Sequence, residues 1–178
     1  EDIAIDEIFD LGDHTFTAEE IVRFGINYDP QYFHTSPDLA PQSQFGGLVA
    51  SGWHTVCVGQ RKTVDALFAE EARLRGLGKE PGVSGPSPGV NEMVFKAPVR
   101  PGDTVSYRLW VSGKRPSQSL PGWGLLFNHL EATNQNGELV YRAELVALSK
   151  LRDFRPSLGL RLATWANSIP VLNQLLKR

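Results

Sequence analysis

The chain has 178 residues, of which 41% are hydrophobic and 21% charged, a size and composition typical of a single globular domain. Its 18 Lys and Arg residues against 20 Asp and Glu residues give a formal net charge of −2, so it lacks the positive excess that nucleic-acid binding requires. The single cysteine, Cys57, excludes an intramolecular disulfide, and its apolar neighbours predict a buried thiol.

Metal binding, membrane insertion and secretion are also disfavoured. No CxxC or HxH spacing provides the start of a metal cluster, so we expect no metal site. No run approaches the roughly 18 consecutive apolar residues of a membrane span. The chain begins with the acidic residues Glu1 and Asp2, unlike the basic start of a signal peptide. We therefore expect a cytoplasmic protein that binds neither membranes nor nucleic acids.

The first part of the chain predicts an extended segment followed by a helix. Residues 3–16 mix apolar and acidic side chains without a helical stripe, and we expect them to lie extended along the body. Thr17 and Glu20 have the spacing of a capping box, in which the Thr17 hydroxyl accepts a hydrogen bond from the Glu20 amide. A helix that begins there is expected to end at Asp29, because Pro30 restricts the residue before it.

A loop and a long helix follow. Residues 28–45 contain three prolines and several small polar residues, which indicates a structured loop. Residues 47–68 carry apolar side chains at spacings of three and four without a proline, and this pattern predicts a long helix. Residues 46–52, at its start, are mostly small and all uncharged, which indicates that other backbone or a ligand approaches them closely.

The second half of the chain changes to the alternating pattern of β-strands. The expected strands are residues 91–99, 104–114, 122–132 and 138–151. Asn136 and Gly137 lie between two such runs and form a strong hairpin signal. A long helix followed by antiparallel strands excludes a parallel α/β sheet, which needs crossover helices. The predicted class is α+β, with the long helix on one face of the sheet.

The C-terminal residues predict a helical extension. Residues 156–178 carry Leu, Ile and Trp side chains at alternating spacings of four and three, interrupted at Pro170. We expect this amphipathic stripe to pack on the body or on a partner subunit, and a membrane-surface role is the weaker alternative because the polar face is not strongly basic. The predicted organisation is one domain over residues 1–152 and a helical extension over residues 153–178.

Asp29 and His34 are the candidate catalytic residues. They occur five residues apart in a proline-containing loop, just before the small-residue start of the long helix. A carboxylate and an imidazole that converge there can hold one water and move its proton near neutral pH, which is the minimum apparatus for adding or removing water. From spacing alone, the alternative is that Asp29 caps a turn and His34 is a satisfied loop histidine.

Gly47, Ser51 and Gly52 are the candidate oxyanion-binding or substrate-binding residues. Backbone N–H groups near a helix start stabilise anions, and Gly52 would let a substrate carbonyl approach without a β-carbon in the way. The glycine spacing matches neither a dinucleotide-binding fingerprint nor a P-loop. His54, which follows in the same helix, is interpreted as a core or interface histidine.

Three motifs considered together resemble the MaoC-like dehydratases, the (R)-specific enoyl-CoA hydratase branch of the hot-dog fold. They are Tyr28-Asp29-Pro30-Gln31-Tyr32-Phe33-His34, Phe45-Gly46-Gly47-Leu48-Val49-Ala50-Ser51-Gly52-Trp53 and Pro98-Val99-Arg100-Pro101-Gly102-Asp103-Thr104. The resemblance runs from about residue 17 to residue 152. It implies a long central helix wrapped by an antiparallel sheet, and a homodimer or dimer-based oligomer with active sites near the dimer interface.

The resemblance also implies roles for individual residues. The family's catalytic Asp and His fall on Asp29 and His34, and the glycine whose amide faces the thioester oxygen falls on Gly52. The chain departs from the stricter hydratase pattern in four places. Gln31 and Tyr32 replace an asparagine and a proline, Ser36 stands where many members have aspartate, Ser51 replaces a second histidine, and Gln60 falls where a helix serine can support the catalytic Asp.

The activity that the resemblance implies is reversible addition of water to a trans-2-enoyl thioester. Its substrate is carried on CoA or on an acyl carrier protein, and no further cofactor is expected. Two alternatives are a thioesterase of the same fold and a non-catalytic acyl-CoA-binding subunit. The Asp-x₄-His pair favours the hydratase over the thioesterase, whereas the departures at Ser36 and Ser51 and the C-terminal extension motivate the non-catalytic alternative.

Overall fold

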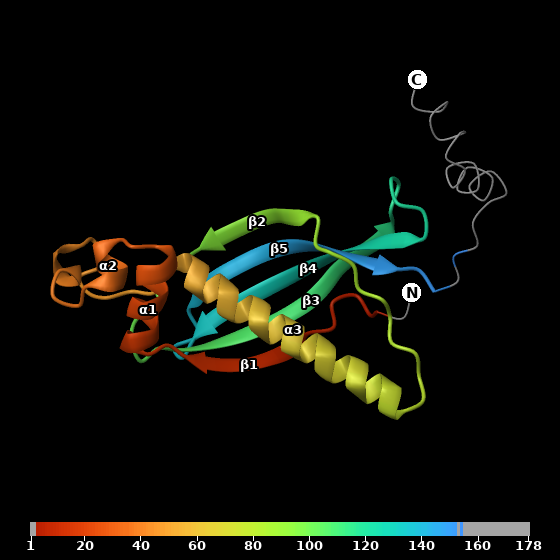
Figure 1. Ribbon diagram of the computed structural model, residues 1–178, viewed down its shortest axis with the longest axis horizontal. Coiled ribbons are helices and arrows are strands. Elements are labelled where there is room, and N and C mark those ends of the chain that lie inside the picture. Colours follow the sequence, from red (N-terminus) through yellow and green to blue (C-terminus); the bar gives the residue numbers. More distant parts are fainter. Residues whose placement is uncertain (1–2, 153, 155–178) are drawn as a thin grey trace, which may run out of the picture.

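A computed structural model describes residues 3–152 and residue 154. Five antiparallel strands form one sheet in the order β1-β3-β4-β5-β2, and the long helix α3 lies across one face of it (Figure 1). The elements are β1 (Phe9–Thr15), α1 (Ala18–Tyr28), α2 (Tyr32–Thr35), the 3-10 turn η1 (Ala40–Gln42), α3 (Gly52–Gly76), β2 (Gly89–Phe95), β3 (Thr104–Pro116), β4 (Trp123–Asn134) and β5 (Leu139–Lys150). The predicted α+β class, with a long helix on an antiparallel sheet, is confirmed.

Helix α1 begins as its sequence predicts. The Thr17 hydroxyl accepts a hydrogen bond from the Glu20 amide at 3.2 Å. The Glu20 carboxylate completes no capping box, because its Oε1 lies 2.7 Å from His14 Nε2 instead. His14 comes from β1, which pairs with β3 at one edge of the sheet, so the central part of the expected extended segment joins the sheet.

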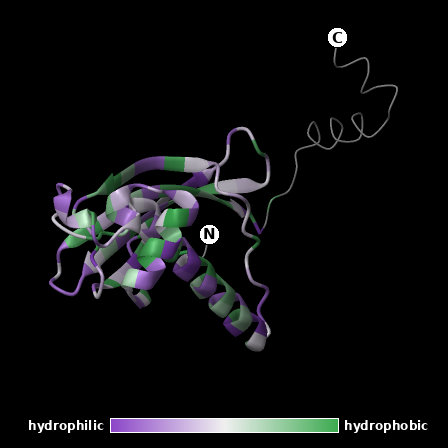
Figure 2. Ribbon diagram, turned by 60° about the vertical axis from the view of Figure 1, so that its left-hand side comes forward, coloured by the Kyte–Doolittle hydropathy of each residue, from purple (hydrophilic) through white to green (hydrophobic). Residues whose placement is uncertain are grey.

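Helix α3 begins later and ends later than its periodicity predicts. The expected helix over residues 47–68 starts at Gly52, because the amides before it bond to distant segments. Val49 N–H donates to the Phe33 carbonyl at 3.1 Å, and Ala50 N–H donates to the Val99 carbonyl at 2.8 Å. Backbone groups held in this way are unavailable to a helical ladder. The helix then continues to Gly76, and its second half carries both hydrophobic and hydrophilic exposed residues (Figure 2).

The first half of α3 packs on the sheet with one face only. Its buried residues are His54, Thr55 and Gly59, and the Tyr107 hydroxyl from β3 donates to the Thr55 carbonyl at 3.1 Å. Trp53 and Cys57 lie four residues apart on another face and are both exposed. The expected burial of the Cys57 thiol is therefore wrong, because apolar neighbours in sequence do not place a residue on the core side of a helix.

The strands agree with the predicted ones, with shifted ends. Gly137 adopts a φ of +78° in the hairpin between β4 and β5, which suits a glycine. β2 ends at Phe95 rather than at residue 99, because the chain then leaves the sheet and Val99 binds Ala50. Within the described residues, no helix is long and apolar enough to cross a bilayer. The expected helix over residues 156–178 lies outside the described residues, and the boundary at residue 152 stays a prediction.

Candidate active site

Asp29 is held at the end of α1 with both carboxylate oxygens hydrogen-bonded. Its N–H donates to the Gly25 carbonyl at 2.9 Å, which makes it the C-cap of α1. The Ser51 hydroxyl donates to Oδ2 at 2.7 Å, and the Gln31 side-chain amide donates to Oδ1 at 2.9 Å. The Asp29 side chain is 21% exposed. Asp29 is thus oriented by two side chains and still reached by solvent.

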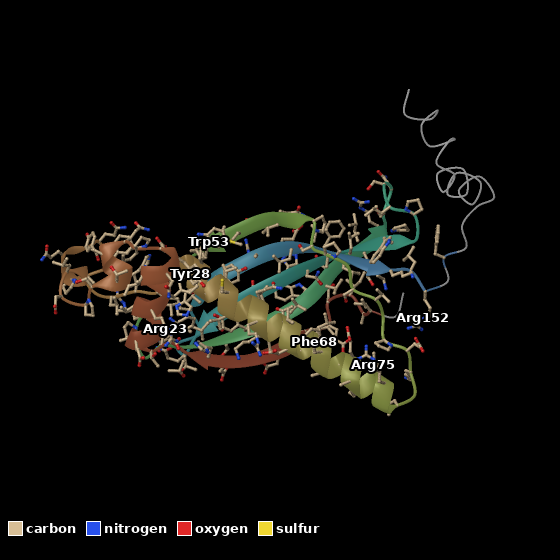
Figure 3. The ribbon with its side chains drawn as sticks, viewed as in Figure 1. Arg23, Tyr28, Trp53, Phe68, Arg75 and Arg152 are labelled. Carbon is tan, nitrogen blue, oxygen red and sulfur yellow. The ribbon has the colours of Figure 1, made fainter. Side chains whose placement is uncertain are left out.

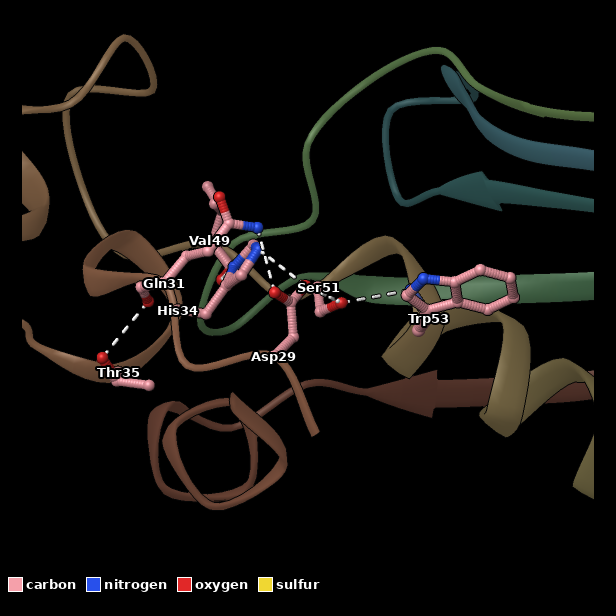
Figure 4. A network of polar contacts seen from close by, with 7 residues as sticks. All are labelled: Asp29, Gln31, His34, Thr35, Val49, Ser51 and Trp53. Carbon is pink, nitrogen blue, oxygen red and sulfur yellow. Dashed lines mark hydrogen bonds and ion pairs between the residues drawn. The ribbon is translucent and has the colours of Figure 1, made fainter. Parts of the chain in front are cut away.

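His34 lies on α2, and its ring is oriented by a backbone carbonyl. Nδ1 lies 2.7 Å from the carbonyl oxygen of Val49. Because a carbonyl only accepts, Nδ1 carries the hydrogen, and a neutral ring leaves Nε2 as a proton acceptor. Nε2 lies 3.4 Å from Asp29 Oδ2 (Figure 4). The structure therefore brings Asp29 and His34 together through the nitrogen that can accept a proton.

The surroundings of Asp29 favour its ionised form. Burial raises the pKa of this carboxyl, but the hydrogen bonds from Gln31 and Ser51 and the nearby His34 ring together leave the pKa below its ordinary value. Asp29 is therefore a carboxylate at neutral pH. The pair combines an anion that can orient a water with a nitrogen base that can take its proton, as general acid–base catalysis requires.

Ser51 connects the start of α3 to the carboxylate. It is the N-cap of α3, and its hydroxyl oxygen accepts from the Trp53 amide at 3.2 Å while the hydroxyl hydrogen goes to Asp29. The structure thus places Ser51, a candidate for binding substrate, beside Asp29 as a donor. Gln60, which the sequence comparison aligned with a possible supporting position, is exposed two turns further along α3. The side-chain hydrogen bonds to Asp29 come from Ser51 and Gln31.

The two candidate glycines occupy different places. Gly52 is the first residue of α3, where an amide has no acceptor within the helix and points out of its N-terminus. It also follows Ser51 directly, the residue whose hydroxyl donates to Asp29. Gly47 lies in the loop before α3, where a β-carbon would be 3.5 Å from Arg100 Nη1. Among the described residues, Gly47 has no contact that joins it to the pair.

A second cluster of polar side chains, which the sequence patterns did not predict, is formed by His14, Glu20, Arg23, Asn27 and His54. His54 is 7% exposed and stacks on Phe24 with ring centroids 4.5 Å apart. Burial lowers the pKa of His54 to about 4, and its Nδ1 has no hydrogen-bond partner among the described residues. The cluster lines a cavity of about 370 Å³ that also includes Tyr28 but neither Asp29 nor His34. Tyr28 and Trp53 mark this end of the molecule in Figure 3.

Comparison with known proteins identifies similar sequences across most of the chain. The family model described as a MaoC-like domain matches residues 3–121. An uncharacterized protein of Bacillus subtilis, YdeM, is 28% identical over 150 residues, which are 84% of this chain and 97% of the relative.

Solved structures show the same architecture. A MaoC-like dehydratase from Rhodospirillum rubrum is 28% identical, with a TM-score of 0.65 over 88% of this chain and 97% of its own. A monoamine oxidase regulatory protein from Archaeoglobus fulgidus is 25% identical, with a TM-score of 0.68 over 84% of this chain and 92% of its own. The long helix and its surrounding sheet are therefore the hot-dog fold that the sequence motifs imply.

Proposed function

This chain belongs to the MaoC-like domain family, and from that premise we propose that it reversibly hydrates a trans-2-enoyl thioester to a 3-hydroxyacyl thioester. The observation that carries the proposal is the 3.4 Å separation between Asp29 Oδ2 and His34 Nε2, with the tautomer of His34 set by Val49. A similar structure named a MaoC-like dehydratase supports the reaction class, because dehydration is the same reaction in reverse.

The pair activates a water that lies between it and the substrate. One hydrogen of the water is donated to the Asp29 carboxylate and the other to His34 Nε2. His34 takes the second proton as the water oxygen bonds to the β-carbon of the substrate. The electron pair of the double bond moves toward the thioester carbonyl, and the nearby Asp29 anion stabilises the imidazolium that has formed.

The product forms when the α-carbon is protonated. His34 returns its proton to this carbon, so one molecule of water has been added across the double bond and the pair is restored. The Gly52 amide donates a hydrogen bond to the thioester oxygen while that oxygen carries negative charge. The water supplies the proton that reaches the α-carbon, and His34 relays it. The carrier of the acyl group is CoA or an acyl carrier protein.

We also propose that the chain acts as a homodimer. Large apolar side chains are exposed at the end of the molecule that holds the site, where Tyr28 is 75% and Trp53 59% exposed. Exposed apolar clusters of this kind are typical of protein interfaces. Sedimentation of the purified chain at micromolar concentration tests the assembly, and a monomer would contradict it.

Loss of enoyl absorbance with crotonyl-CoA tests the proposed reaction. Removing a general acid or base costs about 10²–10⁴ in rate, so Asp29→Asn and His34→Ala should nearly abolish turnover. Asp38→Asn, an exposed position in the same loop, is the matched control and should retain activity. Release of free thiol instead of loss of absorbance would identify a thioesterase. Acyl-CoA binding without either signal would identify a non-catalytic binding subunit.

A further inference from the structure

The ring of Phe95 covers the residue that would bind the thioester oxygen. A β-carbon built on Gly52 would lie 2.8 to 3.0 Å from three atoms of this ring, closer than real contacts allow. The ring therefore packs directly on the α-carbon of Gly52. Gly52 follows Ser51, whose hydroxyl is bonded to Asp29. Phe95 thus packs against the first turn of α3. The residue it contacts, Gly52, is next in sequence to Ser51, which is hydrogen-bonded to the Asp29 carboxylate.

The backbone on both sides of Phe95 is tied down. Phe95 is the last residue of β2 and pairs with Tyr141 of β5. Lys96 N–H then donates to the Val140 carbonyl at 3.0 Å, and the Val99 carbonyl accepts from Ala50, two residues before Gly52. The backbone that carries the ring is therefore held in place on both sides of Phe95 and is not part of a free loop.

The Phe95 ring is packed against Gly52 and Tyr141 and can move toward solvent. On one side it meets Gly52, and on another it stacks on Tyr141 with centroids 5.8 Å apart. Tyr141 is completely buried and cannot recede. The Phe95 side chain itself is 49% exposed, so its remaining side faces solvent. A molecule that approaches the Gly52 amide from solvent either packs against this ring or turns it outward.

We propose that Phe95 is a specificity-determining residue that limits the acyl group to short, unbranched chains. The inference rests on the proposed function. A thioester oxygen that accepts from Gly52 N–H lies about 3 Å from that nitrogen, and the ring packs on the α-carbon bonded to the same nitrogen, so the ring is within reach of the groups attached to the carbonyl carbon. Each additional methylene that a pocket excludes changes the ratio of kcat/KM between two substrates by roughly 10- to 200-fold. A ring at this place, which must be displaced before a longer chain can enter, therefore discriminates against longer acyl chains.

The test compares Phe95→Ala with the wild-type protein on two substrates, crotonyl-CoA and trans-2-octenoyl-CoA. The ratio of kcat/KM for the octenoyl to the crotonyl substrate should rise about tenfold or more when the ring is removed. Val90→Ala is the matched control, since Val90 is a 46% exposed residue of the same strand that lies five residues from Phe95. Its ratio should stay within about twofold of wild type. An unchanged ratio in Phe95→Ala would overturn the inference.

A binding measurement separates this inference from the proposed reaction. Butyryl-CoA and octanoyl-CoA have no double bond to hydrate, and calorimetric titration gives their Kd values without turnover. Phe95→Ala should favour octanoyl-CoA over butyryl-CoA about tenfold more than wild type does, even if the wild-type protein hydrates nothing. If wild type is active and the ratio of the two Kd values is the same in wild type and Phe95→Ala, the role of Phe95 is rejected and the proposed reaction is retained. Failure of wild type to bind either thioester would reject both proposals.

A stability measurement checks the contact itself. Gly52→Ala should lower the free energy of unfolding by about 1–3 kcal/mol through the clash with the ring. This loss is counted apart from the difference in helix propensity between glycine and alanine. Adding Phe95→Ala to Gly52→Ala should cost less than Phe95→Ala costs in the wild-type background, because the clash is then gone. Additive losses would show that the ring does not rest on Gly52 and would overturn the inference.

Discussion

The carbonyl oxygen of His34 lies 2.7 Å from the position that a β-carbon on Gly25 would occupy. Gly25 is a buried residue of α1, so this helix packs directly on the backbone of His34, the residue that carries the candidate imidazole. Backbone atoms cannot turn aside as a side chain can. The distance between α1 and His34, and with it the separation of Asp29 from His34, therefore depends on the absence of a side chain at position 25.

Gly25→Ala should move Asp29 and His34, the proposed catalytic pair, apart. The added carbon forces α1 and α2 apart, which should cost about 1–3 kcal/mol in unfolding free energy. A displacement of about 1 Å at reacting groups costs roughly 10²-fold in rate, so kcat with crotonyl-CoA should fall by that order. Gly76→Ala is the control, because it lies at the end of α3 with no atom within 4 Å of the new β-carbon. Equal activity in both variants would contradict this account of the packing.

Ser51→Ala should destabilise the start of α3 and raise the pKa of the Asp29 carboxyl. Loss of an N-cap serine costs about 0.5–2 kcal/mol in unfolding free energy. Loss of its hydrogen bond removes one cause of the lowered pKa of Asp29, so the acidic limb of the pH profile of kcat/KM should move to higher pH. Ser36→Ala, which removes a hydroxyl that accepts from Leu39 N–H, should leave that limb in place. A limb that does not move in Ser51→Ala would show that Asp29 is not the group that titrates.

Gln31→Ala should shift the same titration with little change in stability. The Gln31 side chain is exposed and donates to Asp29 Oδ1, and this bond also lowers the pKa of the carboxyl. Its removal should raise the pKa of Asp29, as measured by carboxyl carbon NMR, while the unfolding free energy stays within about 0.5 kcal/mol. Gln44→Ala is an exposed control in the same loop region. A pKa of Asp29 equal in wild type and Gln31→Ala would contradict the assigned bond.

His54 should make stability depend on pH in a defined window. Burial lowers its pKa to about 4 in the folded chain from an ordinary value of 6.5. Between these values the unfolded chain binds a proton that the folded chain does not, so stability is complete above pH 6.5 and falls as pH decreases toward 4. The loss is at most about 3 kcal/mol, at about 1.4 kcal/mol per pH unit.

His54→Phe isolates this contribution. The variant keeps a planar ring against Phe24 but cannot titrate, so its unfolding free energy in urea should fall less between pH 6.5 and 4 than that of wild type. It also removes the Nδ1 that has no partner among the described residues, which should offset part of any packing cost at pH 7. Parallel pH dependences in the two proteins would show that His54 is already charged in the folded state.

Local sequence patterns were sufficient to predict the type of most elements. The Thr17 cap, the alternation of the four strands and the turn at Gly137 depend on neighbours within a few residues, and such signals are present in the chain itself. The five-residue offset of Asp29 and His34 also predicts a candidate pair, and the fold places the two side chains 3.4 Å apart. Their catalytic roles stay predictions that the variants above test.

The tertiary structure alone decided the start of α3, the exposure of Cys57 and the partners of Asp29. Helical periodicity continues back to residue 47, but contacts with Phe33 and Val99, which are distant in sequence, hold the preceding amides in an extended form. Ser51 and Gln31 look like losses when compared with the family motif, yet in space both donate to the Asp29 carboxylate. Spacing along a chain carries information about one helix or strand, whereas these contacts arise only when separate elements pack together.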